Sequence, residues 1–358
     1  MRPVLYLAIT SHGFGHAVRT ASVAAKVQEL LPDTLLVFVT TVPHWLLDGY
    51  IKGDFIQRPK MLDVGVIQPD SFTMDQPATL EKLRNIRHRA KAIIADEVNF
   101  LKTNRASLVF ADIPPLAAPI AHTAGLPCWF MGNFGWDFIY RAWGGEFLAE
   151  ADWITEKYQT GDRLFRLPLN EPMEQFPNIT NVGLIGGDPN HNLAALREAF
   201  GLHKPKEKTI LLSFGGLGLN GIPYGTLAQF PGYQFITFDR QAPNLDNLCK
   251  IEDVSLRPVD FMPLCDRLVS KPGFGTFSEA MRLDMPISTL TRDDFAEGEI
   301  LIENLKTYSY HQILDPTSFA AGNWDFLREA PIPPTGDHPI NKNGLTAIAT
   351  EIANFLST

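Results

Sequence analysis

Two glycines and two histidines fall within five consecutive residues of the segment "SHGFGHAVRT" (11–20), directly after an apolar run. Gly13 and Gly15 allow a sharp turn and a close approach of the backbone to a ligand, and His16 lies in the first turn of the helix that the next residues predict. An imidazole in that place can accept a proton at neutral pH. Three interpretations stay open on these residues: a phosphate-binding turn, a catalytic histidine, or only the bend between a first strand and a first helix.

The end of the second predicted strand bears on the choice of cofactor. A nicotinamide dinucleotide site would need an acidic residue there, about 20 positions after the glycine turn. The run "TLLVFVTT" (34–41) ends without one. This counts against a dehydrogenase.

A second glycine turn follows an apolar run in "SFGGLGLNG" (213–221). Backbone N–H groups at Gly215 and Gly216 are in a position to face a diphosphate. No Gly-Lys-Ser/Thr follows, so the segment is not a Walker loop.

The segment "SKPGFGTFSEA" (270–280) predicts the start of a helix, whose N-terminal dipole and free N–H groups can hold phosphate oxygens. The candidates for this role are Gly273, Gly275, Thr276 and Ser278. Glu279 could accept hydrogen bonds from a ribose. The alternative is that Thr276, Ser278 and Glu279 are only signals of a helix start.

Four acidic residues follow the apolar run "MPISTLT" (285–291): Asp293, Asp294, Glu297 and Glu299. They could recognise sugar hydroxyls, bind a divalent cation, or only begin a helix, where acidic residues are common. A cation site is the weakest of the three, because no matching carboxylate pair or histidine cluster stands out elsewhere.

A basic segment, "KLRNIRHRAK" (82–91), lies on a probable helix. Its cations could meet an anionic lipid headgroup, in a peripheral membrane contact, or a phosphate-bearing acceptor, and the alternative is a solvated basic face. They are Lys82, Arg84, Arg87, Arg89 and Lys91.

An aromatic segment, "GNFGWDFIY" (132–140), follows the apolar "PCWFM". If that run is a strand, Asn133, Trp136 and Asp137 line the same crevice as His16. Aromatic rings with few polar groups suit sugar binding, although Trp136 could equally belong to the core.

Composition sets the broad class. With 358 residues the chain exceeds one ordinary hydrophobic core, which favours two domains. A net charge of −9 argues against a protein that binds nucleic acid by neutralising its phosphates. Three cysteines without CxxC spacing support neither a disulfide framework nor a zinc site, and they favour the cytoplasm. Neither a signal peptide nor a membrane-spanning stretch is predicted.

Apolar runs alternate with helical periodicity along the whole chain, a pattern typical of parallel strands covered on both faces. The pattern restarts near residue 209, after a segment rich in Pro, Asn and Gly (168–209) that we interpret as the inter-domain region. We therefore predict an α/β fold with two Rossmann-like, doubly wound domains at 1–170 and 171–340, closed by a helix within 341–358.

The "HGFGH" turn (12–16) and "GFGTFSEA" (273–280) together resemble the GT-B glycosyltransferases, especially the MurG-like enzymes of family 28 type. A closer resemblance, over nearly the whole chain, is to the glycosyltransferase-like N-terminal domain of plant L-arabinokinases. It is carried also by "LDVGVIQPDSFTMDQPATLEKL" (62–83), "NFGWDFIY" (133–140) and "FGG" (214–216). The kinase half of those proteins has no counterpart here. The resemblance implies GT-B architecture, in which the two domains face a central cleft.

The resemblance also implies roles for residues. His16 matches the Gly-His of the first loop and becomes the candidate base. A nucleoside-diphosphate sugar, UDP-sugar foremost, would bind the C-terminal domain, and an acceptor would approach the N-terminal domain. Positions that match donor-binding residues are Gly215, Gly216, Gly273, Gly275, Thr276 and Glu279. Many relatives have a Gln-containing pair where this chain has Glu297 and Glu299, so the donor sugar stays open.

The activity that follows is a metal-independent, inverting sugar transfer to an unidentified small-molecule, lipid or glycan hydroxyl, without an organic cofactor. Two alternatives remain: a sugar-nucleotide epimerase of the same architecture, and a non-catalytic domain that binds sugar nucleotides. Release of nucleoside diphosphate only when an acceptor is present separates the first activity from both alternatives.

Overall fold

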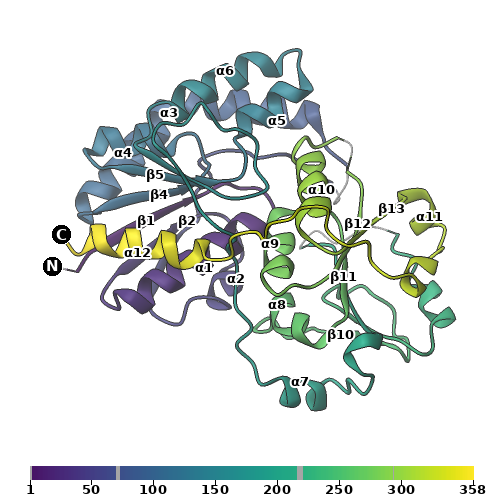
Figure 1. Ribbon diagram of the computed structural model, residues 1–358. Coiled ribbons are helices and arrows are strands. Elements are labelled where there is room, and N and C mark those ends of the chain that lie inside the picture. Colours follow the sequence, from purple (N-terminus) through teal and green to yellow (C-terminus); the bar gives the residue numbers. More distant parts are fainter. Residues whose placement is uncertain (1, 70–72, 216–220, 293) are drawn as a thin grey trace. The chain divides into compact units, whose positions relative to one another are not determined.

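The computed structural model describes residues 2–69, 73–215, 221–292 and 294–358. The chain divides into two compact units (Figure 1). Unit 1 contains Met1–Pro69, Thr73–Gly186 and Asn341–Thr358, and unit 2 contains Gly187–Ile340. Each unit is built on its own parallel sheet, so the predicted pair of Rossmann-like domains is confirmed.

Within the described residues of unit 1, seven parallel strands are ordered β3-β2-β1-β4-β5-β6-β7. Their bounds are β1 (Val4–Ile9), β2 (Leu35–Val39), β3 (Phe55–Arg58), β4 (Leu108–Asp112), β5 (Cys128–Gly132), β6 (Arg163–Arg166) and β7 (Ile179–Asn181). The central strands are buried on both faces, because their continuous Val, Leu, Ile and Phe runs have no polar face to turn to water.

Helices cover both faces of this sheet (Figure 1). One face carries α1 (Gly15–Leu30), α2 (His44–Asp48) and α12 (Gly344–Leu356). The other carries α3 (Gln76–Thr103), α4 (Ala117–Ala124), α5 (Trp136–Trp143) and α6 (Phe147–Tyr158). The long α3 begins at Asp75, whose side chain accepts a hydrogen bond from the Ala78 N–H, an ordinary N-terminal cap.

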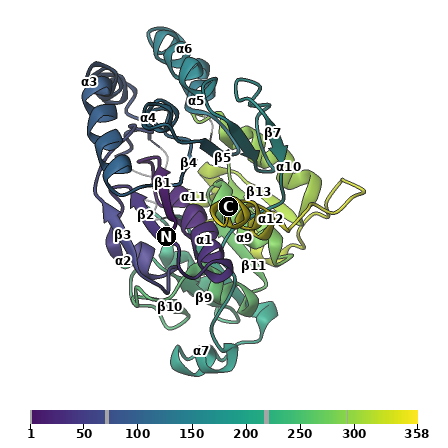
Figure 2. The ribbon, with the colours of Figure 1, turned by 90° about the vertical axis from the view of Figure 1, so that its left-hand side faces the viewer.

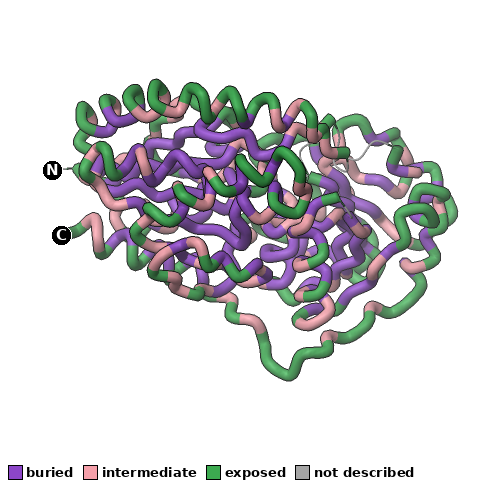
Figure 3. The backbone as a smooth tube through the Cα atoms, turned by 90° about the horizontal axis from the view of Figure 1, so that it is seen from above, coloured by how far each residue is buried: buried purple, intermediate pink, exposed green. Residues whose placement is uncertain are grey.

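Within the described residues of unit 2, six parallel strands are ordered β10-β9-β8-β11-β12-β13. The strands are β8 (Thr209–Ser213), β9 (Gln234–Thr237), β10 (Leu248–Lys250), β11 (Arg267–Ser270), β12 (Ile287–Leu290) and β13 (His311–Leu314). The helices are α7 (Leu193–Ala199), α8 (Pro258–Phe261), α9 (Phe274–Arg282), α10 (Glu297–Tyr308) and α11 (Pro316–Ala320). In both units the buried stretches follow the strands, and many outward-facing helical turns are exposed (Figure 3).

The last helix belongs to unit 1. Just before α12, the chain returns to unit 1 and forms backbone hydrogen bonds with Leu184. The Leu184 N–H donates to the Asn341 carbonyl (2.8 Å), and the Gly344 N–H donates to the Leu184 carbonyl (3.1 Å). A Cβ at Gly344 would meet the Gly183 carbonyl oxygen at 1.9 Å, so only glycine fits there. From this point α12 runs beside α1 (Figure 2).

The observed division differs from the predicted 170/171 boundary and falls at Gly186/Gly187. The intervening residues include β7, which pairs with β6 at the edge of the first sheet. This strand has three residues, "ITN", and none of them is buried. So short a strand leaves no hydrophobic pattern in the sequence.

Candidate functional site

The best-defined polar site of unit 1 lies at the carboxyl ends of β1 and β4. These strands are neighbours, and Ile9 is opposite Asp112 in their register. After β1 the chain turns at Gly13, whose φ of +57° favours glycine. Because α1 begins at Gly15, His16 is carried in its first turn, where it is 7% exposed. Its Nδ1 lies 2.8 Å from the Asp112 Oδ1.

Arg19 lies one helical turn after His16 and binds the same carboxylate. Its Nε donates to the Asp112 Oδ2 (2.6 Å) and its Nη2 to Oδ1 (2.5 Å), a bidentate pair. Its Nη1 donates to the Asn133 Oδ1 (2.7 Å), just after β5. The Thr20 hydroxyl adds a bond of 3.0 Å to Asp112. We call these five residues the His16 cluster.

Asp112 is the electrostatic centre of the His16 cluster. Burial alone would raise the pKa of this carboxyl, but Arg19 and His16 lower it to about 2. Asp112 is therefore ionised at neutral pH, and the charge of Arg19 balances it.

The ionised carboxylate also favours one tautomer of His16. A carboxylate only accepts hydrogen bonds, so the contact with Asp112 favours a proton on Nδ1 and the lone pair of the neutral ring on Nε2, although the Arg19 Nη2, a donor, also lies 2.9 Å from Nδ1. Within the described residues Nε2 has no hydrogen-bond partner, and it is not one of the buried unpartnered atoms. The imidazole is thus oriented with a basic nitrogen available.

A second group of side chains packs beside the His16 ring. The Trp136 Nε1 donates to the Thr10 Oγ1 (2.8 Å), and the Thr10 hydroxyl donates to the Asp63 carboxylate, which also accepts from the Ser11 N–H (2.9 Å). The ring centroids of His16 and Trp136 are 6.2 Å apart. Burial raises the pKa of Asp63.

His12, which the sequence left unexplained, lies edge-on to Trp136 with centroids 5.2 Å apart. Its Nδ1 lies 3.3 Å from the backbone N and O of Val66. His12 therefore connects the glycine turn to the loop that carries Asp63.

The glycine turn at Gly13 and Gly15 has free space beside its backbone. A Cβ added at Gly13 or at Gly15 would meet no atom within 4 Å. The first N–H groups of a helix have no partner within the helix, so the start of α1 can approach a ligand closely.

The aromatic segment contributes only part of what the sequence predicted. Asn133 and Trp136 do lie beside His16, both about 1% exposed. Asp137 does not: its carboxylate accepts from the Thr155 hydroxyl (2.8 Å) and the Gln175 amide (3.0 Å). Burial raises its pKa. The structure thus assigns Asp137 to the packing of α5 on α6.

In unit 2, the candidate phosphate-binding residues surround the ends of β8 and β11. Gly215 follows β8 with φ +81°, and Gly216 lies outside the described residues. Gly273 precedes α9 without a side-chain cap, and a Cβ there would meet no atom within 4 Å. Gly275 and Thr276 are half-buried in the first turn.

Two serines near α9 are fully buried. Ser278 lies within the helix. Ser270, the last residue of β11, has a hydroxyl without a hydrogen-bond partner among the described residues. A buried unpaired hydroxyl costs free energy unless a ligand or water completes it. This orphan supports a ligand site at the start of α9.

Glu279 faces the beginning of unit 2 rather than open space. Its Oε1 accepts from the Gly187 N–H (2.9 Å), and burial raises the pKa of its carboxyl to about 7. Arg282, from the same helix, donates to the Gly187 carbonyl (3.1 Å). Glu279 therefore anchors Gly187, and among the described residues only its Oε2 is left to accept a hydrogen bond from a ribose.

This geometry predicts a pH dependence. The folded pKa of Glu279 is raised from 4.5 to about 7, so the folded state holds this proton more tightly than the unfolded state does. Its contribution to stability is present below pH 4.5 and is lost as the pH rises through 7. We expect wild type to lose stability relative to Glu279→Gln over this range, measured as the difference in Tm. Glu299→Gln, an exposed change, should show no such trend, and a constant difference for Glu279→Gln would contradict the assignment.

The acidic segment does not form one carboxylate cluster. Glu297 is buried at the start of α10, whereas Glu299 and Asp294 are exposed, and Asp293 lies outside the described residues. Near Glu297, burial lowers the pKa of Arg292 to about 10, which Glu297 opposes. Glu297 and Glu299 thus have different surroundings and do not act as a pair in this structure.

The five basic residues of α3 do not form one free face. Arg84 pairs with Glu146 (2.6 Å) and Arg87 with Glu150 (3.3 Å), next to or within α6. Lys82 and Arg89 line a pocket, and Lys91 is exposed.

No described helix is both long and apolar enough to cross a membrane. Among the described residues, no group of three or more His, Cys, Asp or Glu is placed to hold a metal ion.

Sequence reasoning missed Asp112, Arg19 and Asp63. Two signals were present: Asp112 ends the buried run "SLVFAD", and Arg19 follows His16 at the i+3 spacing of one helix face. Asp63 lies in the segment 62–83 that carries part of the family resemblance, but the loop from 59 to 67 has no periodic pattern that would place its side chain.

Comparisons with known proteins agree with this fold. No protein-family model matches the chain. It is 29% identical over 328 residues to an L-arabinokinase of Arabidopsis thaliana, a match that covers 88% of this chain and 31% of that protein. The chain thus spans about a third of the length of the curated relative that it matches.

Solved structures match over the full length. Medicago truncatula UGT71G1 complexed with UDP-glucose has a TM-score of 0.60 at 12% identity, covering 100% of this chain and 99% of that one. A UDP-glucosyltransferase of Polygonum tinctorium that glucosylates indoxyl has a TM-score of 0.62 at 11% identity, covering 100% and 99%. The spinosyn rhamnosyltransferase SpnG, complexed with thymidine diphosphate, has 0.60 at 14%, covering 99% and 96%. The fold is therefore that of the GT-B glycosyltransferases.

Proposed function

We propose that this chain is a glycosyltransferase that moves a sugar from a nucleoside-diphosphate sugar, a UDP-sugar foremost, to an acceptor hydroxyl. The observation that carries the proposal is the contact of His16 with Asp112, which leaves Nε2 free at the carboxyl end of the first sheet. The matched structures supply the donor class: one is complexed with UDP-glucose, another with thymidine diphosphate.

The reaction needs one proton transfer. His16 Nε2 takes the proton of the acceptor hydroxyl while that oxygen attacks the anomeric carbon. The bond from this carbon to the diphosphate oxygen breaks, and the nucleoside diphosphate leaves with the electron pair. Asp112 stabilises the imidazolium that forms. A single displacement inverts the anomeric centre.

The leaving diphosphate requires compensation for its negative charge. The N–H groups at the start of α9 and at Gly215 supply fixed dipoles, and the orphan hydroxyl of Ser270 supplies a donor. This arrangement uses no metal ion. We also propose that this chain is related to the MurG-like glycosyltransferases of family 28 type. We propose that it works in the cytoplasm.

A non-catalytic sugar-nucleotide-binding domain is the second candidate. It is favoured by the match of this chain to only 31% of an L-arabinokinase, because the rest of such a protein could carry the chemistry. Both candidates bind a nucleotide sugar, but only the transferase releases nucleoside diphosphate when an acceptor is added.

Two measurements in sequence test the proposal. Thermal unfolding is followed with uridine, thymidine and guanosine diphosphate sugars, since a ligand at 100 times its Kd adds about 2.7 kcal/mol of stability. Nucleoside diphosphate release is then measured with the stabilising donor, with and without hydroxyl compounds such as indoxyl, which one of the matched enzymes glucosylates. We expect release only with an acceptor. Stabilisation without release under any condition would favour the binding domain, and no stabilisation by any donor would contradict both candidates.

A further inference from the structure

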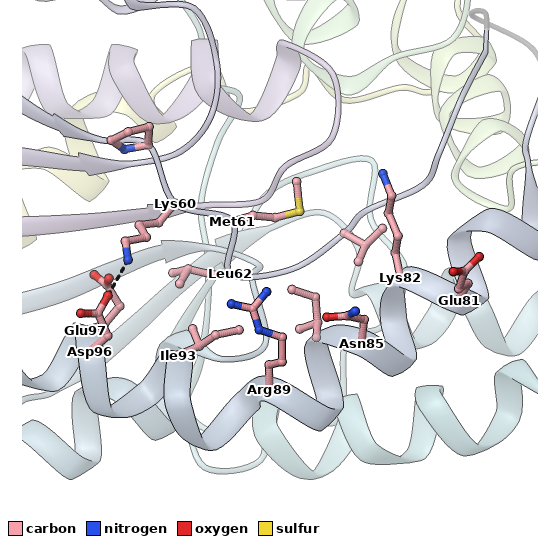
Figure 4. Close-up of a pocket in the computed structure, with 13 residues that line it drawn as sticks. Lys60, Met61, Leu62, Glu81, Lys82, Asn85, Arg89, Ile93, Asp96 and Glu97 are labelled. Atoms are coloured by element: carbon pink, nitrogen blue, oxygen red, sulfur yellow. Dashed lines mark hydrogen bonds and ion pairs between the residues drawn. The ribbon is translucent and has the colours of Figure 1, made fainter.

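Unit 1 contains a pocket of about 350 Å³ that the proposed transfer reaction does not use (Figure 4). Its walls are the loop that follows β3, from Pro59 to Val64, and one side of α3. We call it the α3 pocket. Its volume is within the range of small-molecule sites in proteins.

Part of the pocket lining is apolar. Leu62 and Val64 are buried behind the loop, and Ile86 and Ile93 on α3 are half-buried. Met61, at the loop, also lines the pocket and is 40% exposed. When an apolar molecule replaces water against this surface, the free energy of the system falls.

The pocket is lined by three cations and three carboxylates, which are unevenly paired. At one end Lys60 pairs with Asp96 (2.5 Å), and Glu97 pairs with Arg58 (2.6 Å). Lys82 and Arg89 have no ion-pair partner within the described residues. Glu81, the remaining carboxylate, lies at the far end of the pocket from Asp96 in Figure 4.

Arg89 is the cation best placed for a ligand. Figure 4 shows its guanidinium between Ile93 and Asn85, facing Met61 and Leu62 of the loop. A guanidinium binds a carboxylate or phosphate through two parallel hydrogen bonds. Two other basic residues of α3, Arg84 and Arg87, instead form ion pairs with Glu146 and Glu150.

The pocket is separate from the His16 cluster. Leu62 and Val64 line it, whereas Asp63 between them turns the other way and binds Thr10. The space between the pocket and Trp136 is a void of about 10 Å³, bordered by Leu62 and Ile86. A void of that size holds about one water molecule, so a ligand in the α3 pocket does not reach His16.

We propose that the α3 pocket binds an amphipathic anion: an apolar body about as large as a ten-carbon chain, with one carboxylate or phosphate monoester held by Arg89 and Lys82. The apolar body lies against Met61, Leu62 and Ile86. This binding requires neither the nucleotide sugar nor His16.

Isothermal titration of the full chain with decanoate, decyl phosphate and decanol tests the proposal without any nucleotide sugar. We expect one site that prefers at least one of the anions over the neutral alcohol by about tenfold. Whichever anion binds more tightly identifies the head group. If neither anion binds, or if decanol binds as tightly as both, the proposal is overturned.

Variants locate the site. Arg89→Gln and Met61→Glu, both at exposed positions, are expected to weaken binding of the preferred anion by about tenfold or more, the first by removing the guanidinium and the second by adding a repulsive charge. Lys91→Gln, two residues along the same helix and outside the pocket lining, is the matched control and should change the Kd less than twofold. Wild-type affinity in both pocket variants would place the ligand elsewhere and refute the assignment.

Discussion

His16→Ala is expected to lower kcat for sugar transfer by about 10²- to 10⁴-fold, the usual contribution of a positioned general base. The acceptor hydroxyl must lose its proton as it attacks, and the His16 Nε2 is the basic nitrogen that Asp112 and Arg19 hold in place. The Kd of the nucleotide sugar should stay within about twofold, because the residues proposed to hold the donor all belong to unit 2. The measurement is acceptor-dependent release of nucleoside diphosphate at saturating donor.

His44→Ala is the matched control for this experiment. His44 belongs to the same unit, but its side chain is 61% exposed and pairs with Asp48 on the surface. Its removal should leave kcat unchanged. A His16→Ala protein that transfers sugar within a few-fold of wild type would show that another group takes the proton.

The second large effect is expected from Asp112→Asn. This change leaves the guanidinium of Arg19, which is 2% exposed, without its negative partner. Loss of one partner from a buried ion pair costs about 3–5 kcal/mol of unfolding free energy. The asparagine also no longer stabilises the protonated imidazole, so kcat should fall by about 10²- to 10⁴-fold in the protein that remains folded.

Denaturant unfolding followed by tryptophan fluorescence measures the stability effect in the right unit, because five of the six tryptophans (45, 129, 136, 143 and 153) lie in unit 1. The double variant Arg19→Met/Asp112→Asn removes both charges and should be less destabilised than the sum of the single variants. Strict additivity would mean that the two charges do not stabilise each other.

The pH dependence of this loss follows from the same carboxylate. Because the folded pKa of Asp112 is lowered from 3.8 to about 2, its contribution to stability is present above pH 3.8 and is lost as the pH falls through 2. The difference between wild type and Asp112→Asn should therefore shrink toward pH 2. A difference that stays constant down to pH 2 would argue against an ionised Asp112.

Much of the fold could be predicted from the sequence because the central strands are mostly apolar along their length. The runs that contain β1, β4 and β8 are buried almost entirely, and such runs have few alternatives to a parallel sheet. Edge strands were missed for the opposite reason. β3 and β7 are short and largely unburied, so they carry no periodic signal, and the unit boundary moved with β7.

The site was predictable only as far as local sequence positions a side chain. The glycine turn places His16 in the first turn of α1, and that much was foreseen. Its partner Asp112 is 96 residues away, and only the pairing of β1 with β4 brings the two together. For Glu279 the local pattern was misleading. It predicted a carboxylate that accepts hydrogen bonds from a ribose, but the Glu279 Oε1 accepts one from a backbone N–H 92 residues earlier. Long-range pairing of this kind leaves no trace in local spacing.

The fate of the sugar tests the central claim most directly. A nucleotide sugar labelled in its sugar is incubated with wild type and with His16→Ala, with and without an acceptor alcohol, and the products are separated. We predict that wild type moves the label onto the acceptor, only when the acceptor is present, and that His16→Ala moves it at least 100-fold more slowly. Label that stays on the nucleotide sugar under all conditions, or that appears there only as an epimer, would contradict a glycosyltransferase.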